Sequence, residues 1–156
     1  MLSLVEMISL LPKLKEYFPF LGERAVTEND LQWLCFRDGV EVVFRDDVPK
    51  GVYAMSAGEH FILLNTKLFG WSLLYVFAHE FAHYLFHAPS NSSFHLEFFA
   101  SESKRKNHME AESVAALLLL PLCEIEELIE TGLYNSSEEL SELMKTRLRI
   151  LDTYRF

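Results

Sequence analysis

The sequence contains few cysteines, few basic residues and no long apolar run, and each of these shortages excludes a class of protein. Its 156 residues include only two cysteines, Cys35 and Cys123, which are too few for a disulfide scaffold and favour a reducing, cytoplasmic compartment. The 14 lysines and arginines stand against 23 aspartates and glutamates, giving a net charge of -9. This acidic balance argues against direct binding to nucleic acid, which needs a basic surface. The apolar tracts GWSLLYVFA and VAALLLLPLC are too short to span a bilayer, so no membrane insertion is expected.

The chain also lacks repeats, low-complexity tracts and any linker long enough to separate two domains. With 50% apolar and 24% charged residues it has the composition of a folded protein, and its length suits one core. We therefore predict a single domain over residues 1–156. Its predicted parts are N-terminal helices at 1–39, a small sheet at 40–66, helices that carry the candidate site at 71–121, and C-terminal helices at 122–156.

Local signals predict the elements of the first half. A helix is expected over 2–18, kinked or interrupted at Pro12, and a second helix from the N-cap Thr27 to Gly39. The segments VEVVFR, GVYAMS and HFILLN are typical of strands, and the turn residues between them favour an antiparallel meander. A substrate segment is expected to pair as an added strand beside HFILLN.

The second half is predicted to be helical. Residues 71–87 are apolar nearly all round, which indicates a buried helix. Residues 90–107 are expected to form a surface loop with a short helical piece around HLEFF, followed by an apolar helix at 108–120 and acidic helices at 122–131 and 137–154. Together the segments predict an α+β fold with a small antiparallel sheet packed on a helical core.

The helix at 71–87 contains HEFAH, in which His79 and His83 are four residues apart. Two such histidines lie about 6 Å apart along the axis and share a face, so both rings can reach one metal ion. Glu80 lies next to the first histidine, where its carboxylate can meet a water on that ion as general base. Three such groups in a buried helix are costly unless they act together. The pattern is that of the zincins, in which a catalytic zinc has three protein ligands and one open position.

The third ligand must come from elsewhere. Pro89 stands where the extended HExxHxxGxxH pattern needs a histidine, and His87 lies about 12 Å from His79 along the axis, too far for one ion to bind the whole set. His87 is instead expected to support a ligand, contact substrate or interact with the helix-end dipole. Glu110 is favoured as third ligand because it opens an apolar helix and needs a partner, while Glu112 points about 200° away. The other candidates are Glu97, Glu102, His95 and His108.

HEFAHYLFH followed by MEAESVAALLLLP resembles the ImmA/IrrE family of metallopeptidases, which carry HELGHxLLH and EAxxFAxxLLxP on two helices. The resemblance covers most of the chain from Val40 onward. It departs at Phe81-Ala82, where an aliphatic residue and glycine are usual, and at Glu112 and Val114. The resemblance implies a gluzincin-like zinc peptidase that cleaves a DNA-binding repressor in a stress response.

The sequence therefore predicts a zinc endopeptidase in which His79, His83 and Glu110 bind Zn²⁺ and Glu80 is the general base. A basic helix-turn-helix repressor would suit the acidic charge of the chain. Two rivals stay open, a catalytically silent zincin-like binding or regulatory subunit and a helical transcription regulator that contains the motif by chance. A second donor to the oxyanion is also expected; its candidates are Tyr84, Tyr134, His60 and His108.

Overall fold

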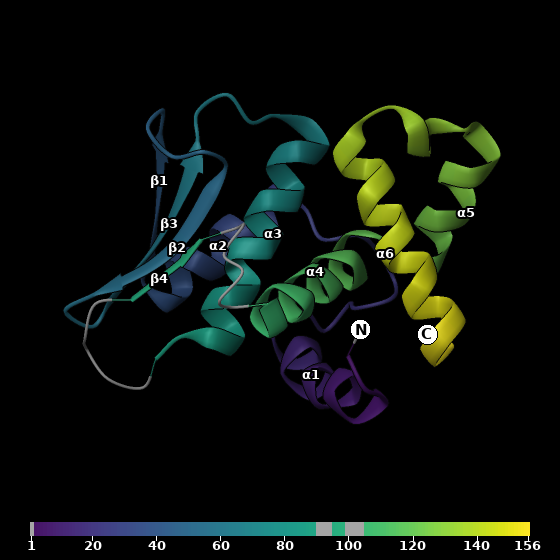
Figure 1. The fold of residues 1–156 in the computed structure, drawn as a ribbon, viewed down its shortest axis with the longest axis horizontal. Helices are drawn as coiled ribbons and strands as arrows, with labels where there is room; N and C mark the ends of the chain where they lie inside the picture. The colour runs from purple at the N-terminus through teal and green to yellow at the C-terminus, as the bar shows by residue number, and fades with distance from the viewer. Residues whose placement is uncertain (1, 90–94, 99–104) are drawn as a thin grey trace.

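The strands of the protein lie together on one side and most of its helices on the other (Figure 1). The computed structural model describes residues 2–89, 95–98 and 105–156. Its elements are α1 (Leu4–Tyr17), α2 (Glu28–Asp38), β1 (Val40–Arg45), β2 (Gly51–Ser56), β3 (Glu59–Asn65), α3 (Gly70–His87), β4 (His95–Phe98), α4 (Arg105–Leu119), α5 (Leu122–Thr131), the 3₁₀ turn η2 (Leu133–Asn135) and α6 (Glu138–Tyr154). This is an α+β fold, as the sequence predicts.

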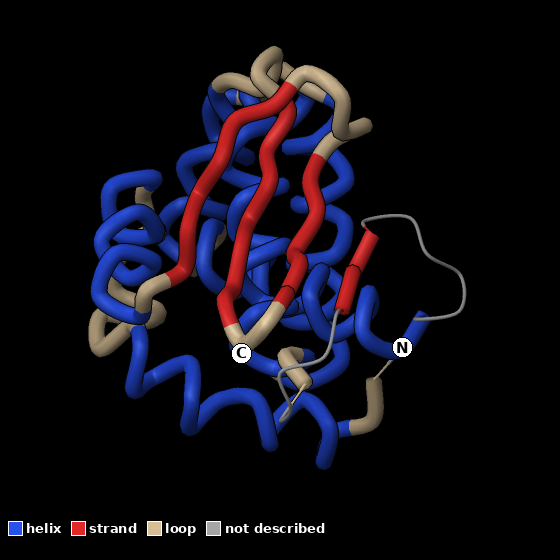
Figure 2. The backbone as a smooth tube through the Cα atoms, turned by 90° about the vertical axis from the view of Figure 1, so that its left-hand side faces the viewer, coloured by secondary structure: helices blue, strands red, loops and turns tan. Residues whose placement is uncertain are grey.

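The sheet is mixed, with strand order β1-β3-β2-β4, so the predicted antiparallel meander is wrong (Figure 2). Strand β3 pairs antiparallel with β2, but it also pairs parallel with β1, which is therefore not adjacent to β2. Because both edges of β3 are paired, no substrate can add beside HFILLN, and that expectation is wrong as well. The outer edges of this sheet belong to β1 and β4.

The two connections between these strands explain the order. Ala57 and Gly58 both have positive φ and close a two-residue turn from Ser56 to Glu59, which makes β2 and β3 a tight hairpin. The connection between β1 and β2, residues 46–50, is longer than this turn. The end of β3 lies between the two strands that it joins. There the backbone N–H of Asn65 donates to the carbonyl of Lys50 at 2.8 Å, and its side-chain amide donates to the carbonyl of Val48 at 2.6 Å.

The segment between α3 and α4 also differs from the expected loop. Residues 95–98 form β4, antiparallel to β2, where a short helical piece is expected from the sequence. Helix α4 begins at Arg105, three residues before the predicted start. The rest of the predicted loop lies outside the described residues.

Helix boundaries follow their capping residues closely. Thr27 caps α2 and exchanges hydrogen bonds with Asp30, and Gly39 ends the helix with a φ of 74°. Helix α1 runs through Pro12, so the helix is not interrupted there; the alternative of a kink at Pro12 stays a prediction. The acidic helix α5 has the predicted bounds, and Ser137 caps α6. No helix in the described part of the chain is both long and apolar enough to cross a bilayer.

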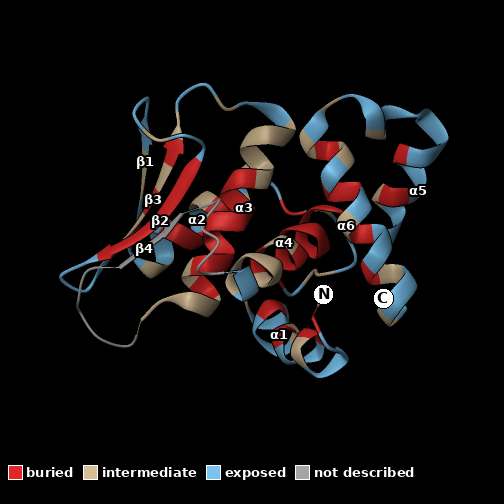
Figure 3. Cartoon of the chain, viewed as in Figure 1, coloured by how far each residue is buried: buried red, intermediate tan, exposed pale blue. Residues whose placement is uncertain are grey.

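Helices α3 and α4 pack together between the sheet and α6 and form the most buried part of the fold (Figure 3). The inner face of the sheet contributes Tyr53 and Ile62, each fully buried. Helix α3 is buried continuously from Val76 to His83, and α4 from Ser113 to Leu119. The polar residues of the HEFAH motif therefore lie inside the core, on a helix held from both sides.

Candidate metal centre

The middle of α3 carries the three polar side chains of the motif. His79, Glu80 and His83 each have a relative exposure of 0%. The i, i+4 spacing places the two imidazole rings on one face, and their Nε2 atoms are 3.2 Å apart. The side chain of Glu80 faces the start of β2, where its Cγ lies 3.1 Å from the position that a Cβ on Gly51 would occupy.

Helix α4 brings a third imidazole to the same point. Nδ1 of His108 lies 3.2 Å from Nε2 of His79. One ring nitrogen from each of His79, His83 and His108 lies within 4.8 Å of the other two, which makes a group that could hold a metal ion. The third member of this group is thus one of the candidates that the sequence names, although not the favoured one.

The spacing of these nitrogens fits a zinc ion. Tetrahedral ligands at about 2.0–2.1 Å from zinc are about 3.3 Å from one another. The two nitrogen pairs at 3.2 Å match that edge length. A single ring nitrogen carries either a proton or a lone pair, so Nε2 of His79 cannot make well-aligned hydrogen bonds to both neighbours. A cation between the rings would instead accept one lone pair from each, and imidazole nitrogens are donors that suit zinc and other transition metals.

Burial keeps the central imidazole in the form that binds metals. The low-dielectric surroundings of His79 lower its pKa to about 3, with smaller contributions from His108 and His87. The ring is therefore neutral at physiological pH, as a metal ligand must be.

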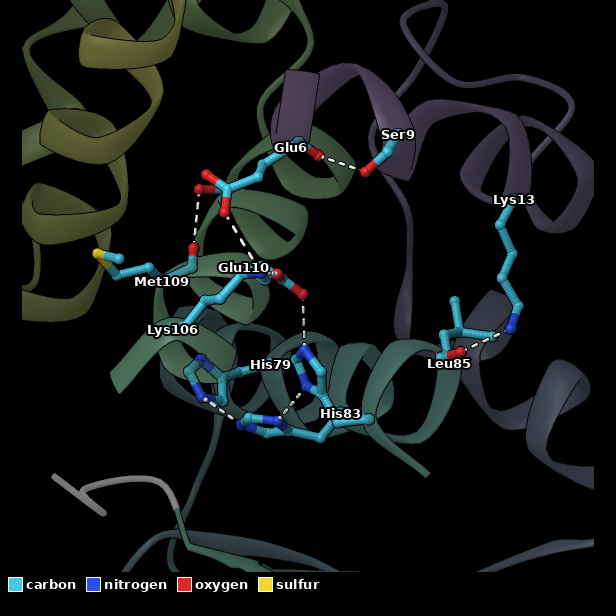
Figure 4. Close-up of polar contacts among 11 residues, drawn as sticks. Glu6, Ser9, Lys13, His79, His83, Leu85, Lys106, Met109 and Glu110 are labelled. Carbon is cyan, nitrogen blue, oxygen red and sulfur yellow. Dashed lines mark hydrogen bonds and ion pairs between the residues drawn. The ribbon is translucent and has the colours of Figure 1, made fainter. Parts of the chain in front are cut away.

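Glu110 contacts a histidine outside this group. Its Oε2 lies 2.8 Å from Nε2 of His87, and Nδ1 of His87 lies 2.8 Å from Nδ1 of His83. Figure 4 labels Glu110 on α4 and the two motif histidines His79 and His83 on α3. On its other side, Oε1 of Glu110 is 3.8 Å from Nζ of Lys106, which also pairs with Glu6. In this structure Glu110 thus reaches the histidines of the motif through His87, and its role as a metal ligand stays a prediction.

The remaining ligand candidates lie elsewhere or outside the description. Glu112 lines a different pocket between α1, α4 and α6, so it and Glu110 do not face the same point, and burial raises the pKa of its carboxyl. His95 and Glu97 belong to β4, which is described by its backbone alone. Glu102 lies outside the described residues.

The candidates for a second oxyanion donor are mostly engaged away from the histidine group. The hydroxyl of Tyr84 donates to Asp38 at 2.8 Å, and Nδ1 of His60 pairs with the hydroxyl of Tyr53 at 2.7 Å. Tyr134 lies in the η2 turn after α5. Of the four candidates, His108 is the one that the structure brings to His79 and His83.

The sequence pattern favours Glu110 over His108 and does not indicate the contact of His87 with Glu110. One signal for His108 was present: it shares a helical face with Ala111 and Ala115, and small residues let two helices approach closely. The contact of His87 with Glu110 joins α3 to α4, and no local pattern encodes it.

Comparison with known proteins gives one finding. The model of the peptidase family M78, described as the IrrE N-terminal-like domain, matches residues 35–150. No curated protein and no solved structure gave a significant match. The matched range runs from the end of α2 into α6 and includes the HEFAH helix, the sheet and α4.

Proposed function

The chain belongs to the IrrE N-terminal-like domain family of peptidases, and on that premise we propose that it is a zinc-dependent endopeptidase. The observation that carries the proposal is the group of three imidazole nitrogens on α3 and α4, with Glu80 beside His79 in the same buried helix. A family match alone would leave the chemistry open, because residues at a site and not the fold determine an activity.

The ligands we propose are His79, His83 and one residue of α4. The nitrogen–nitrogen distances in the structure favour His108 for the third position, whereas the sequence pattern favours Glu110. Either choice leaves the three-ligand arrangement with one open position that is typical of catalytic zinc. When bound, the zinc ion would polarise the peptide carbonyl and lower the pKa of a water molecule.

The protein's own contribution to the reaction is proton transfer by Glu80. Its carboxylate would accept a proton from the water that attacks the peptide carbonyl and deliver it to the departing amine nitrogen. A structural zinc site has no need of a carboxylate in this position and usually fills all four positions with cysteine and histidine. The presence of Glu80 therefore favours an enzyme over a catalytically silent subunit.

The substrate we propose is a basic DNA-binding repressor in the cytoplasm. The support is electrostatic: the chain has a net charge of -9, and α5 carries Glu126, Glu127 and Glu130 on its exposed side. A basic partner would meet an attractive field at long range, which raises its association rate. We expect cleavage of a helix-turn-helix repressor to fall as salt is raised.

The first test is the metal content of protein purified without added metal, measured for the wild type, His79→Ala and Glu80→Gln. We expect about one zinc per chain in the wild type and in Glu80→Gln, and less than a tenth of that in His79→Ala, because Glu80 is not a ligand. A purified helix-turn-helix repressor should then be cleaved by the wild type and not by Glu80→Gln. Absence of metal from the wild type would reject the proposal. Equal cleavage by Glu80→Gln would reject the assignment of the base.

A further inference from the structure

A groove of about 370 Å³ lies between the end of α1 and helix α2, and no residue of the candidate metal centre lines it. Its walls are residues 16–20 and one face of α2, and three of its side chains are the aromatic rings of Tyr17, Phe20 and Trp33. We propose that this groove binds an extended, basic peptide segment of a partner protein, with an apolar residue of the segment against Trp33 and an arginine or lysine beside Glu16.

The shape of the groove suits a peptide. Its lining residues on α2 run from Asn29 to Arg37, a rise of about 12 Å at about 1.5 Å per residue. An extended segment of four residues covers about the same length. Phe18 and Leu34 are buried at its floor, whereas Trp33 is exposed at its rim. An open, aromatic-lined groove of this kind can hold an extended segment whose chain continues on either side.

Charge makes the groove complementary to a basic segment. Two of its charged side chains are already paired, Asp30 with Arg24 at 2.8 Å and Arg37 with Asp38 at 2.9 Å. The exposed carboxylate of Glu16 has no hydrogen bond or ion pair within the described part of the chain. The charge that remains in the groove is therefore negative, in a chain whose net charge is -9, and an arginine or lysine of a partner would be attracted to it.

The rings of the groove already accept cations from the chain itself. The guanidinium group of Arg24 lies 3.5 Å from the ring centroid of Phe20, and that of Arg37 lies 5.6 Å from the ring of Trp33. The electron-rich face of an aromatic ring attracts a cation, and the apolar stem of a long basic side chain packs against the same surface. Because Trp33 is still 59% exposed, much of its ring is available to a partner.

The rest of the fold holds the groove in shape. The rings of Tyr17 and Phe18 pack edge-on against Phe81 of the motif helix, with centroids 6.2 and 6.0 Å apart. Lys13 of α1 donates to the carbonyl of Leu85 near the end of α3 at 2.6 Å (Figure 4). Side chains that are fixed in this way lose little freedom when a partner binds, so less of the binding free energy is spent on ordering them.

Most of the groove lies outside the part of the chain that matches the family model. The match begins at residue 35, and Arg37 is the only lining residue within it. The inference therefore goes beyond the proposed peptidase function, because it assigns a partner-binding surface to residues that the family match does not describe. Its test needs neither metal nor cleavage.

The test is a calorimetric titration of the protein with an acetylated and amidated octapeptide, Ala-Pro-Leu-Arg-Pro-Leu-Arg-Ala. We expect a 1:1 complex with a Kd on the order of 10–100 μM. The same peptide with glutamate in place of both arginines should bind at least about tenfold more weakly. The chain has two tryptophans, so Trp71→Phe leaves Trp33 as its only indole, and the emission of Trp33 should shift when the basic peptide binds.

Matched variants test the two contacts separately. Trp33→Ala should weaken binding at least about tenfold, because aromatic anchors carry much of the energy of such contacts. Phe36→Ala removes another exposed ring from the same helix, outside the groove, and its affinity should stay within about twofold of the wild type. Glu16→Gln should weaken binding about two- to fivefold, whereas Glu130→Gln, which changes the net charge equally but lies on α5, should not.

The outcomes decide the inference. Absence of binding at about 1 mM basic peptide, equal binding of the acidic peptide, or wild-type affinity in Trp33→Ala would overturn it. Thermal unfolding shows whether each variant folds, and Trp33→Gln replaces Trp33→Ala if the alanine variant does not. Glu80→Gln, which lacks the proposed base, should bind the peptide as the wild type does, so a failure of the proposed function would leave this result unchanged.

Discussion

Replacement of Gly51 by alanine tests how closely the sheet and the motif helix must approach. Gly51 begins β2 and does not have positive φ, so alanine can adopt its backbone conformation. The added methyl group would lie 2.5 Å from Cγ1 of Val76, 3.1 Å from Cγ of Glu80 and 3.4 Å from the carbonyl oxygen of Leu63. The first distance is too short for any pair of carbon atoms, so some part of the structure must move.

The neighbour cannot easily move out of the way. Val76 is branched at Cβ and lies on a helix, where one χ1 rotamer dominates, and its side chain is 1% exposed. The clash between the added methyl group and Val76 must then be removed by a shift of α3 relative to β2. Overpacking of this kind lowers the unfolding free energy by about 1–3 kcal/mol. The lower entropy of the unfolded chain with alanine offsets about 0.4–1 kcal/mol of this. We expect Gly51→Ala to lose about 1–2 kcal/mol of unfolding free energy.

The same shift should move the carboxylate of Glu80. A misplacement on the order of 1 Å can cost about a hundredfold in rate, so peptidase activity should fall about tenfold or more. Urea unfolding measures the stability change, and Val76→Ala supplies the matched control because it removes the atom with which the methyl group collides. The double variant Gly51→Ala/Val76→Ala should lose less unfolding free energy than the sum of the two single losses, by at least about 0.5 kcal/mol. Strict additivity, or wild-type stability of Gly51→Ala, would show that the contact does not set the position of α3.

Two further predictions concern the supports around this core. Asp30 accepts two hydrogen bonds from Arg24 at 2.8 and 3.0 Å and completes the capping box of α2 with Thr27. The hydrogen bonds from Arg24, followed by those from Thr27, outweigh the effect of burial and lower the pKa of the Asp30 carboxyl to about 2. Because the folded pKa lies below the unfolded one, its stabilisation is nearly complete above about pH 4 and is lost as pH falls through about 2. Urea unfolding of Asp30→Asn should show a loss of about 1–2 kcal/mol at pH 7 that becomes much smaller as pH approaches 2. Arg147 is 4% exposed and donates to the carbonyl oxygens of Leu120 and Phe156, each at 2.7 Å. Arg147→Met should lower the unfolding free energy by about 1–3 kcal/mol, and a loss below 0.5 kcal/mol would mean that water replaces both donors.

The parts of the fold that depend on local chemistry could be predicted from the sequence. The cap at Thr27, the stop at Gly39 and the bounds of α5 are set by residues within a few positions of each boundary. The same holds for His79 and His83, because the rise and twist of one helix determine their spacing. The family resemblance and the α+β class followed from these local features and from the order of the segments.

Strand order and the fourth strand depend on contacts that local patterns do not record. The segment VEVVFR has the same alternation whether its neighbour is β2 or β3, and only the longer connection at 46–50 lets the end of β3 lie between them. Residues 95–98 form a strand because the edge of β2 is available to pair with them, not because four residues have a strong preference of their own.

The third ligand could not be chosen from the sequence for a related reason. Hydrophobic periodicity reveals the rotation of a helix only when one face is polar, and α4 is buried continuously from Ser113 to Leu119. His108 and Glu110 differ by about 200° around that helix, so exchanging them at the metal centre would require nearly half a turn of α4. Such a rotation would also break the contact between Glu110 and His87 at 2.8 Å, and it would carry Glu112, now about 40° from His108, away from the centre.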